Sequence, residues 1–176
     1  MDPLSLIINT DLGSVYLLAR RYDEAIAQYR KTIEMDPRFY AAHWPLGRVW
    51  ELKGQLNEAI AEYRKAAELN DDPFVLALLG QAYARAGQRE EAQRILARLS
   101  EEAKSRYVRA YSFALMYLAL GDKERAIDEM ERAYRERAGL DVVWIKINPF
   151  LDDLRGNPRF EALVQKVFAP KNRSSP

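Results

Sequence analysis

Apolar residues recur along the chain at the three- and four-residue spacing of amphipathic helices, in short stretches that come in pairs. In the first pair this spacing is kept by Leu12, Tyr16 and Ala19, and then by Tyr22, Ile26, Tyr29 and Ile33. Asp36 and Pro37 end the second stretch, because proline cannot continue a helix and disfavours the helical conformation in the residue before it. The pattern predicts two consecutive helices over about residues 5–38.

The same pattern returns three more times, at spacings of 34, 33 and 34 residues. The period is kept throughout. Equivalent positions are Leu12, Leu46, Leu79 and Phe113; Tyr16, Trp50, Tyr83 and Tyr117; Ala25, Ala59, Ala92 and Ala126; and Arg20, Gly54, Gly87 and Gly121.

Glycine has two predicted roles in this pattern. The Arg20, Gly54, Gly87 and Gly121 set falls between the two helices of each pair, where a left-handed residue can end a helix. Gly13, Gly47 and Gly80 follow the leucine of each repeat inside the first helix, where a small residue lets two helices approach closely.

The segments LGSVYLLARRYDEAIAQYRKTIEMDP and LGRVWELKGQLNEAIAEYRKAAEL resemble the tetratricopeptide repeat, and two later segments carry the same pattern with drift. The resemblance covers about residues 5–137, in repeats of about 5–38, 39–72, 73–106 and 107–137. It implies an all-α, right-handed α-solenoid of four helical hairpins.

Residues 138–169 are predicted to form a degenerate capping repeat, followed by a disordered tail at 170–176. Trp144 falls in the repeat's aromatic position, and Pro149 is expected to end that first helix after about two turns. Asn157 and Pro158 predict a new helix, whose apolar side begins at Phe160. This end of the chain is also similar to the last segment of repeat arrays in bacterial signalling and regulatory proteins.

The composition argues against several classes of function. The 27 basic and 26 acidic residues nearly balance, which argues against direct binding of nucleic acid or an anionic membrane. The chain has no cysteine and one histidine, and it contains no recognised catalytic or phosphate-binding motif. We therefore expect a cytoplasmic protein that is not an enzyme and has no cofactor or metal. His43 is expected to be structural, and the pairs Asp71–Asp72 and Asp152–Asp153 are assigned to turns.

The resemblance implies that the first helices line a concave groove that binds a protein or peptide. Aromatic and arginine side chains are favoured anchors of such interfaces, and a mildly positive groove would prefer segments that combine an apolar residue with Asp or Glu. The positions expected to face the ligand are Trp44, Arg48, Glu51, Phe74, Gln81, Arg85 and Tyr111.

An alternative function rests on the N-terminal helix. Leu4, Ile7 and Ile8 follow Asp2–Pro3, which looks like the end of a preceding repeat, with no polar capping helix before them. We expect these side chains to be exposed, as in a piece of a longer array. They would then support self-association, so homo-oligomerisation is the second hypothesis.

Overall fold

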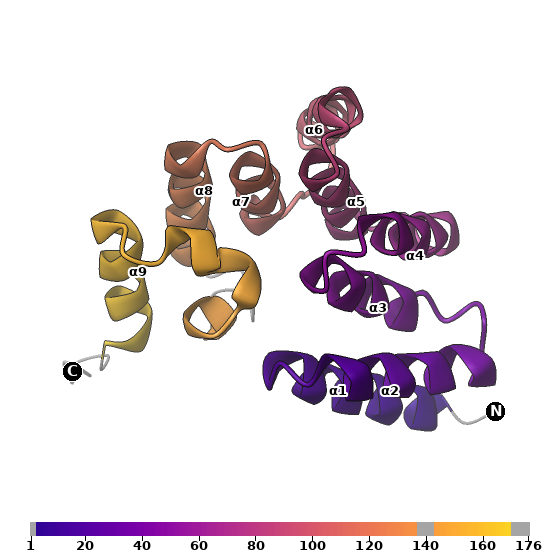
Figure 1. Ribbon diagram of the computed structural model, residues 1–176. Coiled ribbons are helices and arrows are strands. Elements are labelled where there is room, and N and C mark those ends of the chain that lie inside the picture. The colour runs from indigo at the N-terminus through magenta and orange to yellow at the C-terminus, as the bar shows by residue number, and fades with distance from the viewer. Residues whose placement is uncertain (1–2, 137–142, 170–176) are drawn as a thin grey trace, which may run out of the picture.

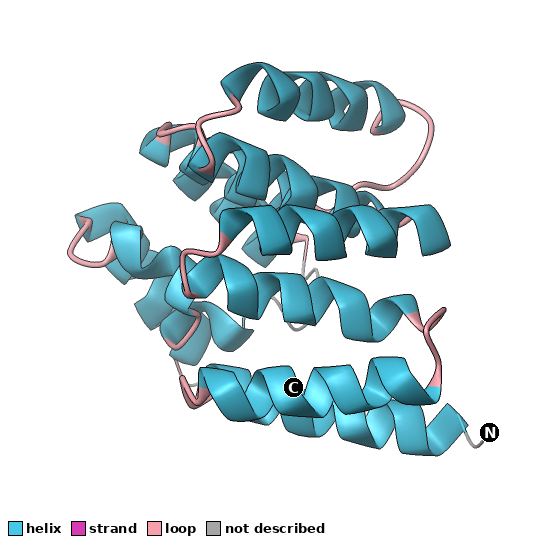
Figure 2. Cartoon of the chain, turned by 45° about the vertical axis from the view of Figure 1, so that its right-hand side comes forward, coloured by secondary structure: helices cyan, strands magenta, loops and turns pink. Residues whose placement is uncertain are grey.

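The computed structural model describes residues 3–136 and 143–169, and all regular structure in these ranges is helical (Figures 1 and 2). The α-helices are α1 (Pro3–Leu18), α2 (Tyr22–Met35), α3 (Tyr40–Leu52), α4 (Leu56–Leu69), α5 (Pro73–Arg85), α6 (Arg89–Glu102), α7 (Ala110–Ala119), α8 (Lys123–Arg135) and α9 (Pro158–Phe168). Two 3₁₀ helices, η1 (Val143–Lys146) and η2 (Pro149–Leu154), precede α9.

Helices α1 to α8 pair in sequence as four hairpins, and successive hairpins stack side by side in an arc (Figure 1). The fold is the all-α helical solenoid that the sequence predicts. Between hairpins, α2 packs on α3, α4 on α5, and α5 on α7. The first helices α3, α5 and α7 therefore lie along the inner side of the arc.

The turns inside the hairpins use the predicted left-handed residues. Gly54, Gly87 and Gly121 have φ values of 76°, 77° and 88°, and Arg20 adopts the same conformation at 58°. Met35 ends α2 just before Asp36 and Pro37, as expected. Asp122 caps α8, where its side chain accepts a hydrogen bond from the Arg125 N–H.

The C-terminal part differs from the expected pair of helices. The predicted first helix is a single short 3₁₀ helix, η1, and the side chain of Trp144 lies outside the described residues. Pro149 starts η2 instead of only ending η1, because Asn148 caps it by accepting from the Phe150 N–H. Helix α9 begins at Pro158 as predicted and packs on α8, with Phe160 and Leu163 buried. The tail at 170–176 is outside the described residues.

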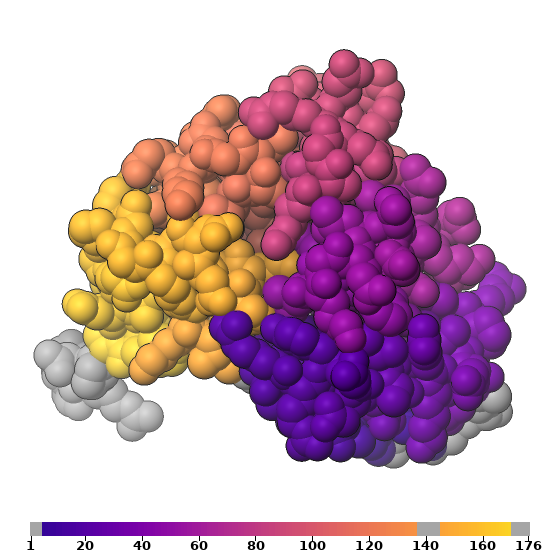
Figure 3. Space-filling model, in the orientation of Figure 1, coloured from indigo at the N-terminus to yellow at the C-terminus, as the bar shows by residue number. Residues whose placement is uncertain are grey.

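Residues 148–154, which we call the inner segment, lie on the inner side of the arc, facing α1 and α3 (Figures 1 and 3). Its Asp152 forms an ion pair of 2.9 Å with Arg20 in the turn after α1. The Lys123 ammonium donates to the Asp153 carbonyl oxygen at 2.9 Å, at the start of α8. The inner segment thus connects the first and the last hairpin across the concave face.

The N-terminal helix exposes part of its apolar surface. Ile7 and Ile8 are exposed as expected, whereas Leu6 is buried. The side chain of Leu4 lies outside the described residues. None of the described helices is long and apolar enough to cross a membrane.

Candidate functional site

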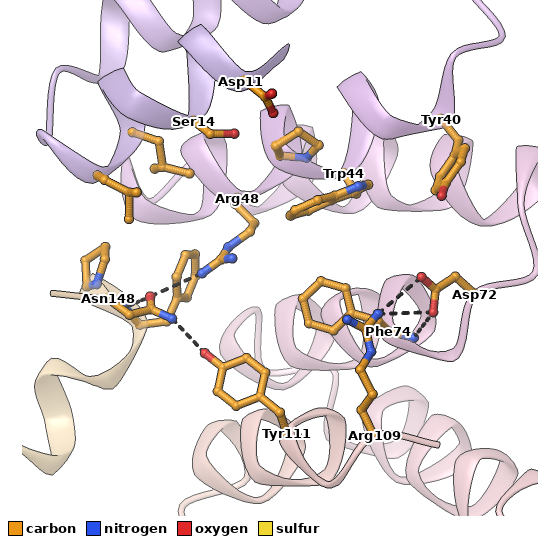
Figure 4. Close-up of a pocket in the computed structure, with 15 residues that line it drawn as sticks. Asp11, Ser14, Tyr40, Trp44, Arg48, Asp72, Phe74, Arg109, Tyr111 and Asn148 are labelled. Atoms are coloured by element: carbon orange, nitrogen blue, oxygen red, sulfur yellow. Dashed lines mark hydrogen bonds and ion pairs between the residues drawn. The ribbon is translucent and has the colours of Figure 1, made fainter. Parts of the chain in front are cut away.

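A cavity of about 470 Å³ opens on the concave face between α1, α3, α5, α7 and η2 (Figure 4). Three aromatic side chains from successive first helices line it. The Trp44 and Phe74 rings meet edge to face with centroids 5.6 Å apart, and Phe74 stacks on Tyr111 at 6.4 Å. Trp44 and Tyr111 occupy equivalent positions two repeats apart, whereas Phe74 lies three residues, about one helical turn, earlier in the repeat between them. A cavity of this size and lining fits a ligand side chain.

Arg48 extends from α3 into the same cavity, toward the inner segment (Figure 4). Its guanidinium lies 4.4 Å from the centre of the Phe150 ring, and Nη2 donates to the Asn148 side-chain oxygen at 3.2 Å. Its Nε is buried and finds no acceptor among the residues that the structure describes. A buried donor without an acceptor is costly, so this N–H favours a ligand that supplies an oxygen.

Acidic and basic groups alternate around the cavity. Asp72 caps α5 by accepting from the Phe74 N–H and also pairs with Arg109 at 3.2 Å. The Arg109 guanidinium covers the Phe74 ring at 4.3 Å. Asp11 of α1 also lines the cavity. The opening therefore carries both signs of charge, and it is less positive than the sequence suggests.

Glu51 and Gln81 lie beneath the concave surface rather than on it. Only 1% of Glu51 is exposed, and its carboxylate accepts hydrogen bonds from Tyr63 at 2.9 Å and Gln81 at 2.7 Å. Burial raises the pKa of Glu51, while the Arg85 guanidinium 3.5 Å away and the two hydrogen bonds oppose that rise. Contacts inside the protein thus satisfy the Glu51 carboxylate, whereas the buried Gln81 Oε1 has no hydrogen-bond partner among the described residues.

Arg85 and Tyr111 instead contact the inner segment. The Arg85 guanidinium lies 6.0 Å from the centre of the Phe150 ring. The Asn148 amide donates to the Tyr111 hydroxyl at 2.6 Å. Arg48, Arg85 and Tyr111 are three of the seven residues that the sequence predicts to face a ligand, and all three contact the inner segment.

Sequence reasoning did not find the residues that complete the cavity. Arg109 and Tyr40 carry no signal beyond their residue type. Asn148 and Pro149 do carry one, because they are the same helix-starting pair as Asn157 and Pro158. Recognising that pair would have predicted η2, but not that it folds onto the concave face.

The other candidate residues have structural contacts. His43 is buried, with Nδ1 2.7 Å from a Glu62 carboxylate oxygen and Nε2 3.0 Å from the Pro37 carbonyl oxygen. Asp71, in the loop between α4 and α5, forms an ion pair of 3.1 Å with Arg106 in the loop between α6 and α7. In the described ranges, no three His, Asp or Glu side chains come together as a group that could hold a metal ion.

Three sequence models of the tetratricopeptide repeat match the chain, at residues 10–73, 52–116 and 110–138. Together they cover residues 10–138, which include the four hairpins except the start of α1. No curated protein gives a significant match to the chain.

Solved structures share the fold at low sequence identity. The crystal structure of the APC/C hetero-tetramer Cut9–Hcn1 aligns with a TM-score of 0.61 at 19% identity, over 92% of this chain and 32% of that one. A crystal structure of MamA protein aligns with a TM-score of 0.52 at 21% identity, covering 92% and 85% of the two chains. YrrB, described as a TPR protein with an unusual peptide-binding site, aligns with a TM-score of 0.53 at 15% identity, covering 90% and 82%.

Proposed function

Because the chain belongs to the tetratricopeptide repeat family, a scaffold for protein interactions, we propose that it binds a peptide segment of another protein in the cavity between Trp44, Phe74 and Tyr111. The observation that carries the proposal is the row of three rings beside a buried Arg48 N–H that has no acceptor in the described structure. The rings suit an apolar side chain, and the N–H suits an oxygen acceptor.

The same groups favour a ligand that combines an apolar residue with Asp or Glu. A carboxylate would accept from the Arg48 Nε and gain the attraction of its charge. Asp11 and Asp72 at the opening would repel further acidic residues. We propose that such a segment, within a regulatory or signalling protein, is the natural ligand.

The test begins with a display library of random peptides selected on the whole chain. Selected peptides are then titrated by calorimetry against Trp44→Ala, Arg48→Ala and a matched control, Arg94→Ala. The Arg94 side chain is 70% exposed on α6 and pairs only with Glu91 among the described contacts. Loss of an interface anchor typically costs about 2 kcal/mol or more, which is roughly a 30-fold loss of affinity.

We expect Trp44→Ala and Arg48→Ala to lose that affinity with unchanged helix content, and Arg94→Ala to bind normally. Selected peptides whose affinity falls with Arg94→Ala but not with the two cavity variants would show that the wrong face was assigned.

A second candidate function, homo-oligomerisation, is favoured by a comparison within the chain. Leu12 and Val15 of α1 are 41% and 60% exposed. In the other three hairpins the equivalent residues are buried: Leu46, Leu79 and Phe113, and Val49, Ala82 and Met116. Helix α1 thus presents an apolar face that the fold covers elsewhere, and a second copy of the chain could cover it.

Sedimentation velocity over a range of concentrations tests this candidate. Self-association should be seen for the wild type and lost in Val15→Glu, because a charge in an apolar interface is unfavourable. Tyr107→Glu, at an exposed aromatic residue far from α1 in sequence, is the control and should associate like the wild type. A wild type that stays monomeric at every concentration would reject homo-oligomerisation.

A further inference from the structure

The concave face has two compartments, and the inner segment fills one of them. The cavity beside Trp44 and Phe74 is open, whereas Phe150 enters the space between Arg48 and Arg85. A remaining space of about 130 Å³ behind Phe150 is lined by residues of α5, α7 and η2. The concave face is therefore not one continuous groove, because Asn148, Pro149 and Phe150 close the open cavity at one end (Figure 4).

The inner segment has the chemistry that this face is expected to bind. It places the apolar Phe150 and Leu151 next to Asp152 and Asp153. Its contacts are those of a bound peptide: an aromatic ring between two guanidinium groups, an amide that donates to Tyr111 and accepts from Arg48, and an acidic residue paired with Arg20.

The polar contacts of the inner segment with Arg20 and Lys123, in the first and last hairpins, are exposed and therefore weak. In the Arg20–Asp152 pair both side chains are about half exposed, at 56% and 46%. Ion pairs with this exposure contribute little to stability. The Lys123 contact with the Asp153 carbonyl oxygen is also at the surface. Release of the inner segment from the concave face would also expose Leu151 and Leu154, which are fully buried in the main apolar core, so a partner must supply apolar side chains in their place.

We propose that the inner segment is a ligand held in cis, and that the compartment between Arg48, Arg85 and Tyr111 recognises proline-led turns of the type Asn-Pro-aromatic-aliphatic-acidic. A partner that carries such a turn binds by replacing the inner segment. The proposal deepens the proposed function and rests on it, because it extends the peptide site from the open cavity into the filled compartment. A partner reaches that compartment only when the inner segment leaves it.

The probe is a fluorescent peptide with the sequence of residues 145–155, IKINPFLDDLR, titrated by anisotropy into the whole chain. The wild type should bind it weakly, since a filled site lowers apparent affinity by the fraction that is free. Phe150→Ala empties the compartment and should bind the probe at least about ten-fold more tightly. Phe168→Ala, which removes a half-exposed ring from α9, is the matched control and should behave as the wild type.

The interaction must also depend on the residues of the compartment. Adding Arg48→Ala to Phe150→Ala should abolish the gain. A probe with alanine in place of its own phenylalanine should not bind any variant. If folded Phe150→Ala binds IKINPFLDDLR no better than the wild type, the proposal is wrong.

A second experiment decides the matter even if Phe150→Ala fails to fold. The natural chain has no cysteine, so Arg20→Cys with Asp152→Cys can be joined by a short bis-maleimide without side reactions at other thiols. The cross-linked chain should not bind the probe, whereas the same variant without cross-linker should bind at least as well as the wild type. Equal binding by the two forms would overturn the proposal.

The two proposals fail in different ways. Absence of any Trp44-dependent peptide in the library would reject the proposed function. Equal affinity of the wild type and Phe150→Ala for the probe would reject only the inference about the inner segment.

Discussion

His43 packs between two oxygen atoms that can only accept hydrogen bonds. Its ring nitrogens face a Glu62 carboxylate oxygen at 2.7 Å and the Pro37 carbonyl oxygen at 3.0 Å. Only the protonated imidazole can donate to both. Burial alone would lower the pKa of His43, but the hydrogen bonds to Glu62 and Pro37 outweigh burial, so the pKa is raised above 6.5.

This geometry predicts how stability depends on pH. Because the folded state holds the His43 proton more tightly than the unfolded state, its contribution is complete below about pH 6.5 and is lost as pH rises through the raised pKa. Chemical denaturation of the wild type between about pH 6 and pH 9 should show a falling free energy of unfolding. His43→Gln should remove this slope, since the chain has no other histidine. Parallel curves for the two proteins would contradict the assignment.

Close contact between the helices of each hairpin depends on small residues at equivalent places. A Cβ atom added to Gly47 would lie 2.8 Å from the Tyr63 ring and 3.2 Å from the Ala59 backbone oxygen. At Gly80 it would lie 2.5 Å from the Met116 sulfur of α7, in a flexible side chain, and 2.9 Å from the Ile95 Cγ2 of the paired helix α6. The two glycines occupy the same position of the repeat, but their neighbours differ in how far they can move.

The two sites should therefore respond differently to alanine. Overpacking against the rigid Tyr63 ring and the α4 backbone typically costs 1–3 kcal/mol, roughly, so Gly47→Ala should lower the free energy of unfolding by about that amount. Gly80→Ala should cost less than Gly47→Ala, because it meets two side chains and no backbone atom, Met116 is flexible, and alanine favours the helix by about 1 kcal/mol over glycine. Urea denaturation of both variants measures the difference, and an equal loss at the two sites would count against this account.

At the scale of helices and turns, the sequence predicts most of the structure. The features that it does not predict depend on contacts between distant parts of the chain. Helix ends and turns follow from local residues such as Pro37 and Gly54, and the stacking of the hairpins follows from the repeat period. The position of Phe150 does not, because its partners Arg48 and Arg85 lie in distant hairpins. Glu51 was expected on the concave surface by its position in the helix, yet Tyr63 and Gln81 provide hydrogen bonds that hold it below.

Across the whole molecule, the C-terminal part covers the last hairpin. Phe160 and Leu163 of α9 are buried, and Arg159 forms ion pairs with three acidic residues of α8, at 2.7, 2.8 and 3.3 Å. These pairs are exposed and add little, so the buried apolar side chains carry most of the stabilisation. Without α9, the outer side of α8 would lose its apolar cover.

Truncation tests this role. A chain that ends at Glu136 should melt at a lower temperature or aggregate, because each large buried side chain contributes roughly 1.5–3 kcal/mol. A loss of a few kcal/mol corresponds to a fall of about 10 °C for a chain of this size. A chain that ends at Ala169 is the control and should melt like the wild type. An unchanged melting temperature after removal of residues 137–176 would show that α9 has no stabilising role.

The bridge from Arg20 to Asp152 also bears on how the chain folds and unfolds. In an open array each repeat touches only its neighbours, so the terminal hairpins can fray one at a time. Here a contact that spans 132 residues joins the first hairpin to the last part of the chain. Loss of order at either end breaks this contact with the other end. The array is therefore not a purely linear stack, although an ion pair this exposed adds only a weak link between its two ends.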